Sequence, residues 1–189
     1  MGRWEPDAEG RFRAAALELF VERGYDLTTV ADIAERAGLT RRTFFRYFTD
    51  KREVLFSGSA TLQQTMVAAL NNAPECATAF EAVAAALDAT TEFFGDNREF
   101  ARQRNLVIAA HADLHERELI KLATLSAALA EGLRRRKVDE LDASLAAEAG
   151  IAVFRVAFGQ WVAEAEQRGF GEIVTESLAR LKAMTSIKW

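Results

Sequence analysis

Residues 28–48 read TTVADIAERAGLTRRTFFRYF and contain two short helical patterns separated by a glycine. Thr28 or Thr29 offers an N-cap for a short helix, and Gly38 closes that helix. Thr40 then caps a second short helix. Two short helices joined by a turn that contains glycine have the dimensions of a helix-turn-helix, so the stretch predicts a DNA-binding motif.

The charges around the second short helix point the same way. Residues 39–52 hold five basic side chains and one acidic one, a net charge of +4. The whole chain carries -4, which taken alone argues against a nucleic-acid partner. Residues 1–56 balance ten basic against ten acidic side chains, so the remainder carries the acidic excess. A basic segment concentrated in this way is typical of phosphate and base contacts.

Helical geometry sorts the side chains of the second short helix. Phe44 and Phe48 are four residues apart and, with Ile33 and Ala34, should form the face that packs on the first helix. The other long side chains point elsewhere: Arg41, Arg42, Phe45 and Arg46. An aromatic ring exposed among arginines is costly unless something covers it, and DNA would cover it. The alternative is a solvated basic face.

The rest of the chain predicts an all-α protein of about nine helices. Its 189 residues include 36 Ala against 17 Val plus Ile, and only two prolines. A first helix carries Phe12 to Phe20 and stops at Gly24. After the two short helices, we expect one from Asp50 through Leu70 and then further helices over about 78–94, 98–110, 114–134, 142–168 and 172–184. The basic run 134–137 fits a solvated helix end.

No feature predicts a membrane or secreted protein. The N-terminus reaches charges and a proline before any apolar run, unlike a signal peptide. The longest apolar stretch, residues 145–163, contains Glu148, Arg155 and Gln160, which favours a buried helix over a membrane span. A lone Cys76 favours a reducing compartment. We therefore expect a cytoplasmic protein.

Residues 11–55 resemble the TetR family of one-component transcriptional repressors. The resemblance lies in AALELF (15–20), GY (24–25), TTVADIA (28–34), AGLT (37–40), TFFRYF (43–48) and DKREVL (50–55). It implies an all-α fold with an N-terminal three-helix helix-turn-helix domain over 1–55. It further implies a C-terminal helical ligand-binding and dimerisation domain over 56–189, and a homodimer on a near-palindromic DNA operator. The predicted function is a repressor that a small effector releases from this operator.

Candidate DNA contacts follow from both lines of reasoning. Thr28 and Thr29 can grip a phosphate at the start of the first short helix. Matched position by position, the recognition helix holds Thr40, Arg41, Arg42, Thr43, Phe45, Arg46 and Tyr47. Lys51 matches the phosphate-binding lysine of the family. Many members have Gly or Ala where this chain has Arg42, so the base preference cannot be transferred.

The C-terminal part offers candidate ligand contacts. The segment 104–108, followed by Asp113-Leu114 and a long helix rich in Leu and Ala, is similar to a branch of the family that senses acyl-CoA-like ligands. This similarity favours an acidic or acyl-type effector. Aromatic side chains could line a pocket, although for any one of them a place in the core is the simpler expectation. The candidate set is Phe93, Phe100, Arg104, His111, Phe154, Arg155 and Phe158.

Arg155 is the most constrained of this set. Its helical neighbours at three and four residues are apolar, so we expect a buried guanidinium that needs an anion. That anion is either the acid group of a ligand or an internal carboxylate such as Glu148, and both alternatives stay open. The last two long helices should form the dimer, since small residues along 149–159 permit close helix approach.

Other chemistry finds little support. His111 and His115 are four residues apart but have no obvious third partner, so we expect no metal. Cys76 has no second cysteine to pair with and is expected to be inert. No nucleophile–base pair is visible, so we expect a regulator without a cofactor and not an enzyme. A helix-turn-helix regulator with a protein effector, or with none, is the alternative, and a small helical enzyme ranks last.

Overall fold

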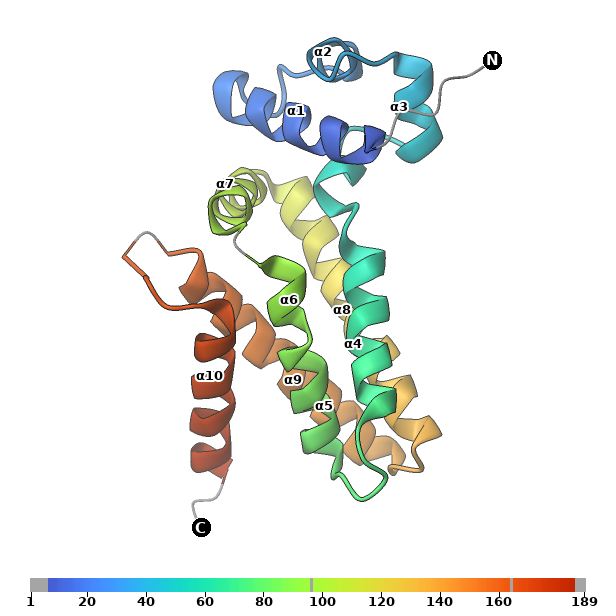
Figure 1. Ribbon diagram of the computed structural model, residues 1–189, viewed down its shortest axis with the longest axis vertical. Helices are drawn as coiled ribbons and strands as arrows, with labels where there is room; N and C mark the ends of the chain where they lie inside the picture. The colour runs from blue at the N-terminus through green and yellow to red at the C-terminus, as the bar shows by residue number, and fades with distance from the viewer. Residues whose placement is uncertain (1–6, 96, 164, 186–189) are drawn as a thin grey trace. The chain divides into compact units, whose positions relative to one another are not determined.

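The computed structural model describes residues 7–95, 97–163 and 165–185. Within these ranges all regular structure is helical, with ten α-helices, one 3-10 helix and no strand (Figure 1). The predicted all-α fold is confirmed. None of the described helices has both the length and the apolar character needed to cross a bilayer.

The chain forms two compact units. Unit 1 consists of residues 1–58 and 100–116, and unit 2 of residues 59–99 and 117–189. The division expected at residue 55 lies near the end of the first segment of unit 1. The segment 100–116, which is distant in sequence, nevertheless belongs with the N-terminal residues.

Unit 1 contains α1 (Ala8–Arg23), α2 (Val30–Arg36), α3 (Arg41–Tyr47) and the 3-10 helix η1 (Glu53–Phe56). It also contains most of α7 (Arg98–Ala109) and the first turn of α8 (Ala112–Arg135). Its core is formed by apolar side chains of all these elements. The second segment contributes Val107, Ile108 and Leu114, each at most 8% exposed.

The centre of the unit 1 core is aromatic. The ring of Phe12 in α1 lies edge-on to Phe44 at 5.2 Å and to Phe48 at 6.1 Å between centroids. Phe12, Phe44 and Ile33 are completely buried, and Ala34 is 2% exposed. Edge-to-face pairs add about 0.5–1.5 kcal/mol each beyond the burial of apolar surface. The predicted packing of Phe44 and Phe48 on the first helix, α1, is confirmed.

The helices of unit 1 begin and end at the predicted caps and glycines. Gly24 ends α1 with φ 88°, and Gly38 follows α2 with φ 64°. Residues that carry a Cβ rarely adopt these backbone conformations. Thr29, and not Thr28, is the N-cap of α2, in a capping box with Asp32. Thr40 caps α3 by accepting a hydrogen bond from the amide of Thr43 at 3.1 Å.

Three helix boundaries differ from the prediction. The helix expected from Asp50 through Leu70 is divided into η1 and α4 (Ser59–Asn72) at the Ser57–Gly58 turn. The helix expected over 78–94 becomes α5 (Ala79–Asp88) and α6 (Thr90–Phe94). The helix expected to reach residue 168 ends earlier, as α9 (Glu140–Trp161). The apolar periodicity of the sequence continues across such short breaks, so it does not show where a helix is interrupted. Helix ends are also the least certain part of any helix assignment.

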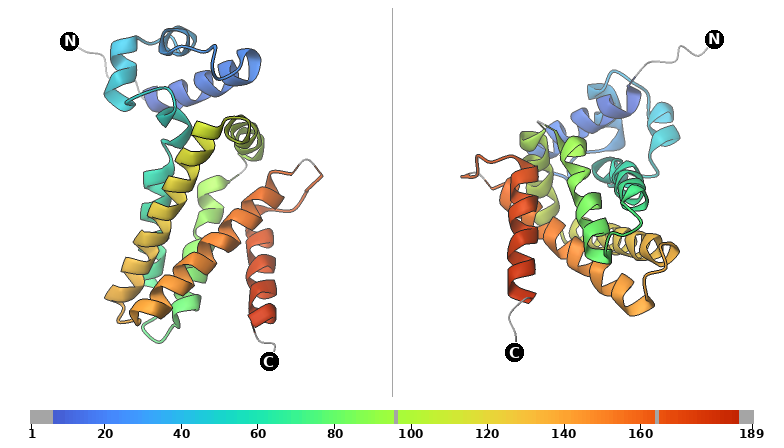
Figure 2. Two further views of the ribbon diagram at one scale, coloured as in Figure 1. Left: turned by 180° about the vertical axis from the view of Figure 1, so that it is seen from behind. Right: turned by 60° about the horizontal axis from the view of Figure 1, so that its bottom comes forward.

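Unit 2 is built from α4, α5, α6, most of α8, α9 and α10 (Phe170–Thr185). Helix α5 packs on α4 and α9, and α10 packs on α9, α5 and α6 (Figure 2). Gly150 permits the close approach of α9 to α5, because a Cβ there would lie 2.4 Å from Cγ1 of Val83. The buried hydroxyl of Ser126 in α8 donates to Oε1 of Glu148 in α9 at 2.6 Å.

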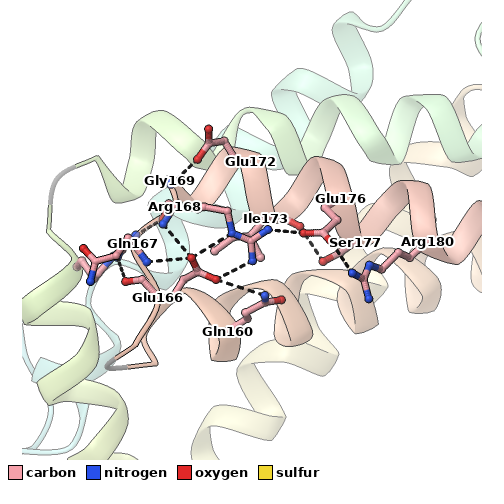
Figure 3. A network of polar contacts seen from close by, with 11 residues as sticks. Gln160, Glu166, Gln167, Arg168, Gly169, Glu172, Ile173, Glu176, Ser177 and Arg180 are labelled. Carbon is pink, nitrogen blue, oxygen red and sulfur yellow. Dashed lines mark hydrogen bonds and ion pairs between the residues drawn. The ribbon is translucent and has the colours of Figure 1, made fainter.

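Ion pairs hold the segment between α9 and α10 (Figure 3). Glu166 accepts from the guanidinium of Arg168 at 2.7 Å and from the amides of Gln167 and Arg168 at 2.9 Å. These donors lower the pKa of Glu166 to about 2. Arg168 also pairs with Glu176 at 2.5 Å, and Glu176 pairs with Arg180. The network fixes the turn that α10 needs in order to fold back on α9.

The basic run at 134–137 is largely paired inside unit 2. Arg134 pairs with Glu131 at 2.9 Å and with Glu140 at 3.0 Å, and Arg135 pairs with Glu131 at 3.3 Å. Arg136 donates to backbone carbonyls at 71, 73 and 74, where α4 ends. The run therefore does more than the solvated helix end that was expected, since it also ties α8 to the end of α4.

Candidate nucleic-acid interface

Helix α3 has one buried face and one exposed face. Phe44 is fully buried, whereas Phe45 is 53% exposed and Tyr47 is 37% exposed. Three arginines surround these exposed rings: Arg41, Arg42 and Arg46, all exposed. The aromatic core of unit 1 fixes the buried face, so the helix presents the other face from a rigid support.

The exposed side chains of α3 differ in how they are held. Arg46 lies over the Tyr47 ring at 5.0 Å and donates to the Tyr47 hydroxyl at 3.1 Å. Within the described ranges, Arg41 and Arg42 make no hydrogen bond or ion pair. Thr43 lies 2.9 Å from Thr40, hydroxyl to hydroxyl. Two guanidinium groups of α3 are thus available for an external anion.

The two threonines before α2 have different roles. Thr29 is the cap, and its amide and hydroxyl both donate to the Asp32 carboxylate, at 2.8 and 2.6 Å. These bonds hold the pKa of Asp32 below its usual value. Thr28 is only 1% exposed, and its hydroxyl donates to the carbonyls of Leu19 and Gly24. The expected contact of the Thr28 side chain with a phosphate is therefore corrected, because that side chain is turned into the core.

Lys51 is turned toward the protein. Its ammonium donates to the carbonyls of Tyr25 at 2.7 Å, Thr28 at 3.0 Å and Asp26 at 3.3 Å. It also lies 4.2 Å from the centroid of the Tyr25 ring. Burial, with Asp113 nearby, raises the pKa of Tyr25 to about 12, so this ring stays neutral. Nothing in the sequence pattern indicated these carbonyl partners.

The candidate ligand residues are divided between the two units. Phe100, Arg104 and His111 belong to unit 1, and the other four belong to unit 2. Arg104 donates to the carbonyl of Leu55 at 2.7 Å and lies over the Phe56 ring at 5.2 Å. Nδ1 of His111 lies 2.8 Å from the carbonyl of Val107. The three residues of unit 1 therefore take part in its internal packing, and their role toward a ligand stays a prediction.

An open apolar groove lies on unit 1 beside His111. Its volume is about 340 Å³. The lining comes from α1 and from α7 with the residues that follow it: Phe20, Val21, Arg102, Gln103, Leu106, Val107, Ala110 and His111. Nε2 of His111 lies 3.9 Å from the Asp26 carboxylate. No cluster of three His, Cys, Asp or Glu side chains suited to a metal occurs in the part of the chain that the structure describes.

The candidate residues of unit 2 lie around an aromatic cluster. Phe154 is 6% exposed and stacks on Phe158 at 6.1 Å, and both rings lie near Phe94. The cluster is completed by Phe93, Trp161 and Phe170. Phe170 was not among the aromatic candidates from the sequence, because it lies beyond a helix break that was placed too late. Phe154, Trp161 and Phe170 are buried in the core, whereas the other three rings are half-buried. A pocket role for them stays a prediction.

Arg155 is exposed, so the expectation that it is buried is wrong. Helix α9 turns a different face to the core, with Ile151, Phe154 and Ala157 buried. The exposed face carries Arg155 together with three apolar side chains that are each at least 60% exposed: Leu141, Leu145 and Val156. Glu148, the expected internal partner, accepts from Ser126 instead. An arginine in water needs no buried anion, so nothing at this position calls for the acid group of a ligand.

Profiles of known families match both parts of the chain. The profile described as "Bacterial regulatory proteins, tetR family" matches residues 12–57. The profile described as "MftR C-terminal domain" matches residues 77–186, more than half of the chain. The two matches together leave only short segments uncovered.

Individual relatives and structures agree with these matches. The HTH-type transcriptional regulator TcmR of Streptomyces glaucescens is 44% identical over 59 residues, 31% of this chain and 26% of TcmR. MftR of Mycobacterium tuberculosis, a regulator that its name assigns to mycofactocin biosynthesis, is 28% identical over 136 residues, 72% of this chain and 69% of MftR. The match to TcmR thus spans about a quarter of that protein.

The fold also recurs among solved structures. The transcriptional regulator FadR from Bacillus subtilis, solved in complex with stearoyl-CoA, has a TM-score of 0.60 at 23% identity. The likeness covers 91% of this chain and 96% of FadR. With one profile over the helix-turn-helix and another over most of the remainder, the protein belongs to the TetR family of bacterial transcriptional regulators, as its N-terminal motifs predicted.

Proposed function

We propose that the protein represses transcription by binding a near-palindromic DNA operator as a homodimer, and that a small acyl-type effector releases it. The observation that carries the proposal is the exposed face of α3. Arg41 and Arg42 have no partner among the described residues, and Phe45 stands exposed beside them. Arginines can fork onto guanine, and an aromatic ring can meet a thymine methyl group.

A homodimer is supported by α9. Its exposed face carries Leu141, Leu145 and Val156, with Ala152 and Gly159 also exposed on the same side. A second copy of the same helix would remove these apolar groups from water. A two-fold symmetric dimer that holds its two α3 helices about one DNA turn apart, ~34 Å, would match successive half-sites of a near-palindrome.

DNA binding is tested by selection followed by titration. The protein is used to enrich duplexes of about 30 bp, enough for two half-sites, from a random-sequence library. Fluorescence anisotropy then measures the Kd for the enriched duplex. We expect Arg42→Ala to raise this Kd by about tenfold or more, as the loss of a bidentate base contact does. Arg180→Ala removes an exposed arginine of α10 and should leave the Kd unchanged.

Two outcomes of this experiment would contradict the proposal. A library that yields no enriched sequence, with Arg42→Ala and the unaltered protein binding duplexes equally, would remove the assignment as a sequence-specific repressor. An enriched sequence without two-fold symmetry would remove the homodimer on a near-palindrome.

The effector proposal is supported by FadR of Bacillus subtilis, which shares the fold at 23% identity and was solved with stearoyl-CoA bound. It is also supported by the segment 104–108, which is similar to acyl-CoA sensors. We expect stearoyl-CoA to raise the Tm and to release the enriched duplex, whereas CoA alone does neither. If no acyl-CoA shifts the Tm at any chain length, a protein effector or none is the better description.

A further inference from the structure

We propose that Glu148 and Arg155 on the exposed face of α9 form two symmetric ion pairs across the homodimer, and that these pairs select an antiparallel second copy of this chain as the partner. The inference rests on the proposed function, because it takes the homodimer from there and adds its orientation, its register and the residues that decide both. It also gives a role to Arg155, which has no anionic partner in the part of the chain that the structure describes.

The exposed residues of α9 follow a regular spacing. Steps of four and three residues alternate along the helix, an average of about 3.5, which places side chains on one stripe and lets two helices pack along it. The opposite side of α9 packs in unit 2, where Ile151 and Phe154 are buried. The stripe is therefore left over for a partner. We call the exposed set the α9 stripe: Leu141, Leu145, Glu148, Ala152, Arg155 and Gly159.

The two charged side chains of the α9 stripe have unused hydrogen-bonding capacity. Glu148 and Arg155 lie seven residues apart, about 10 Å along the helix axis, so they are too distant to pair with each other. Oε1 of Glu148 accepts from the buried Ser126 hydroxyl at 2.6 Å, whereas Oε2 has no partner among the described residues. The serine thus holds the carboxylate in place and leaves one oxygen for an external cation.

The charges decide between the two orientations that two-fold symmetry allows. If the symmetry axis runs parallel to the helices, each side chain meets its own copy, so carboxylate faces carboxylate and guanidinium faces guanidinium. If the axis is perpendicular to the helices, they run antiparallel, and Glu148 of each copy meets Arg155 of the other. Like charges held together in an interface are costly, whereas opposite charges attract. The α9 stripe therefore favours the antiparallel pair.

The sizes of the side chains agree with the register that the charges set. The midpoint between Glu148 and Arg155 lies next to Ala152, and a small side chain at the crossing point lets two helices approach closely. An axis at Ala152 places Leu145, seven residues before it, beside Gly159, seven residues after it, in the other copy. A Cβ at Gly159 would have nothing within 4 Å, so there is room for the leucine side chain. Charge and shape thus point to one arrangement.

The ion pairs select the partner more than they strengthen the dimer. The apolar members of the α9 stripe would bind many apolar helices. A partner with other charges at the two positions would leave Glu148 or Arg155 in the interface without a counter-ion, which is costly. A second copy of this chain satisfies both charges at once.

The first experiment measures the Kd of dimerisation of the full chain by sedimentation equilibrium, without DNA. Arg155→Glu places two carboxylates together at both contacts and should raise the Kd by about a hundredfold, about tenfold for each contact. Arg155 is exposed, so its replacement should leave the fold intact, as circular dichroism checks. Arg23→Glu makes the same change of charge at an exposed arginine of α1 and should leave the Kd unchanged. A Kd unchanged by Arg155→Glu would overturn the inference.

The second experiment mixes two charge-reversed variants. Glu148→Arg should weaken its own dimer as Arg155→Glu does. An equal mixture of the two variants pairs arginine with glutamate at both contacts, so a heterodimer should form with about the Kd of the unaltered protein. Native mass spectrometry identifies it by mass. If Glu148→Arg does not fold, Glu148→Gln keeps an oxygen for Ser126 and should raise the Kd of its own dimer by about tenfold. A mixture of folded variants that stays monomeric, or an unchanged Kd for Glu148→Gln, would overturn the inference.

The third experiment tests the register by disulfide formation in a Cys76→Ser background, which removes the exposed native cysteine. Ala152→Cys should give a cross-linked dimer on oxidation, because its two copies meet at the axis. Leu141→Cys should give none, because eleven residues of helix separate it from the axis and its copies lie about 33 Å apart. Equal cross-linking at both positions would show parallel helices and overturn the inference. An unaltered protein that stays monomeric would overturn the homodimer as well, whereas a dimer indifferent to Arg155→Glu overturns the ion pairs alone.

Discussion

Helices α3 and α9 both expose large apolar side chains, but in different surroundings. Helix α3 exposes Phe45 among arginines, whereas α9 exposes Leu141, Leu145 and Val156 with Arg155 as the one basic side chain of that face. Both helices also bury the opposite side, with Phe44 in α3 and a row of apolar residues that includes Ile151 and Phe154 in α9. The exposed apolar side chains are therefore not the ones that pack each helix on its core. The composition of the two exposed faces indicates two kinds of partner.

The difference lies in what can cover each face. A flat ring beside guanidinium groups suits a polyanion that also presents methyl groups and base edges. A row of branched aliphatic chains with small residues between them suits an equally apolar protein surface. The exposure of apolar side chains alone does not distinguish a DNA-binding face from a protein-binding face. The charged side chains around the exposed apolar groups do.

The largest effect is expected for Leu145→Glu on α9. If a second copy covers this face, the substitution buries an unpaired carboxylate, which costs several kcal/mol. We expect the Kd of dimerisation to rise by about a thousandfold, since 1.4 kcal/mol is a factor of ten. Sedimentation equilibrium measures it. Val21→Glu, at an aliphatic residue of α1 that is 54% exposed, is the control and should leave the dimer intact. Equal behaviour of both variants would contradict the assignment of α9 to the interface.

Adjacent phenylalanines of α3 separate its two faces. Phe44→Ala should lower the free energy of unfolding by about 3–5 kcal/mol, because it empties the centre of the unit 1 core. Phe45→Ala should change it by less than about 0.5 kcal/mol while weakening binding to the enriched duplex. Urea unfolding and anisotropy measure the two quantities. A stability loss for Phe45→Ala as large as for Phe44→Ala would show that α3 has no free face.

Two glycines of α9 provide a matched pair on its buried and exposed sides. Gly150→Ala should cost about 1–3 kcal/mol, since the new methyl group would overlap Val83. Gly159→Ala has nothing within 4 Å and should gain up to about 1 kcal/mol from helix propensity. Thermal unfolding in the Leu145→Glu background keeps the dimer interface out of the comparison. A gain for Gly150→Ala would mean that α5 and α9 are not in close contact.

The smallest effect concerns Asp50, which precedes η1 and follows α3. It accepts from the amides of Arg52 at 2.8 Å and Glu53 at 3.2 Å, and it pairs with the Arg52 guanidinium. These donors, the guanidinium foremost, hold the pKa of Asp50 below its usual value. A carboxylate with a lowered pKa stabilises the fold above the unfolded pKa of about 3.9, and this contribution is lost as the pH falls through the folded value.

The pH dependence follows from that sign. Asp50→Asn should lower the free energy of unfolding by up to about 1 kcal/mol at pH 7, because a neutral amide cannot form the ion pair with the Arg52 guanidinium. The difference from the unaltered protein should shrink below about pH 4. Thermal unfolding at pH 7 and pH 3 measures this. A difference that is the same at both values would mean that the charge of Asp50 contributes nothing.

The sequence allowed the short-range features to be predicted. The caps at Thr29 and Thr40, the stop at Gly24 and the inward face of Phe44 depend on residues a few positions apart, and they appear as expected. These features follow from backbone hydrogen bonding and helical periodicity, which a sequence displays directly. The family resemblance, carried by residues 11–55, predicted an N-terminal helix-turn-helix followed by further helices, but not that residues 100–116 belong to the N-terminal unit.

The predictions that failed concern features that depend on tertiary contacts. Helix α9 is apolar on most sides, so periodicity could not tell which side faces the core, and Arg155 was assigned to the wrong one. The sequence also did not indicate the carbonyl partners of Lys51, which lie more than 20 residues away along the chain. In the sequence, Thr28 and Thr29 are equivalent candidates for the N-cap of α2. In the structure the Thr28 hydroxyl donates to the carbonyl of Leu19, and Thr29 is the cap.

The contribution of residues 100–116 to the core of unit 1 affects how this regulator can be re-engineered. Val107, Ile108 and Leu114 form part of the wall around α1, so a fragment cut after the helix-turn-helix would expose apolar surface to water. A chimera that exchanges DNA-reading segments between relatives therefore has to transplant two discontinuous pieces of chain. A junction placed at the end of the helix-turn-helix would join mismatched halves of one core.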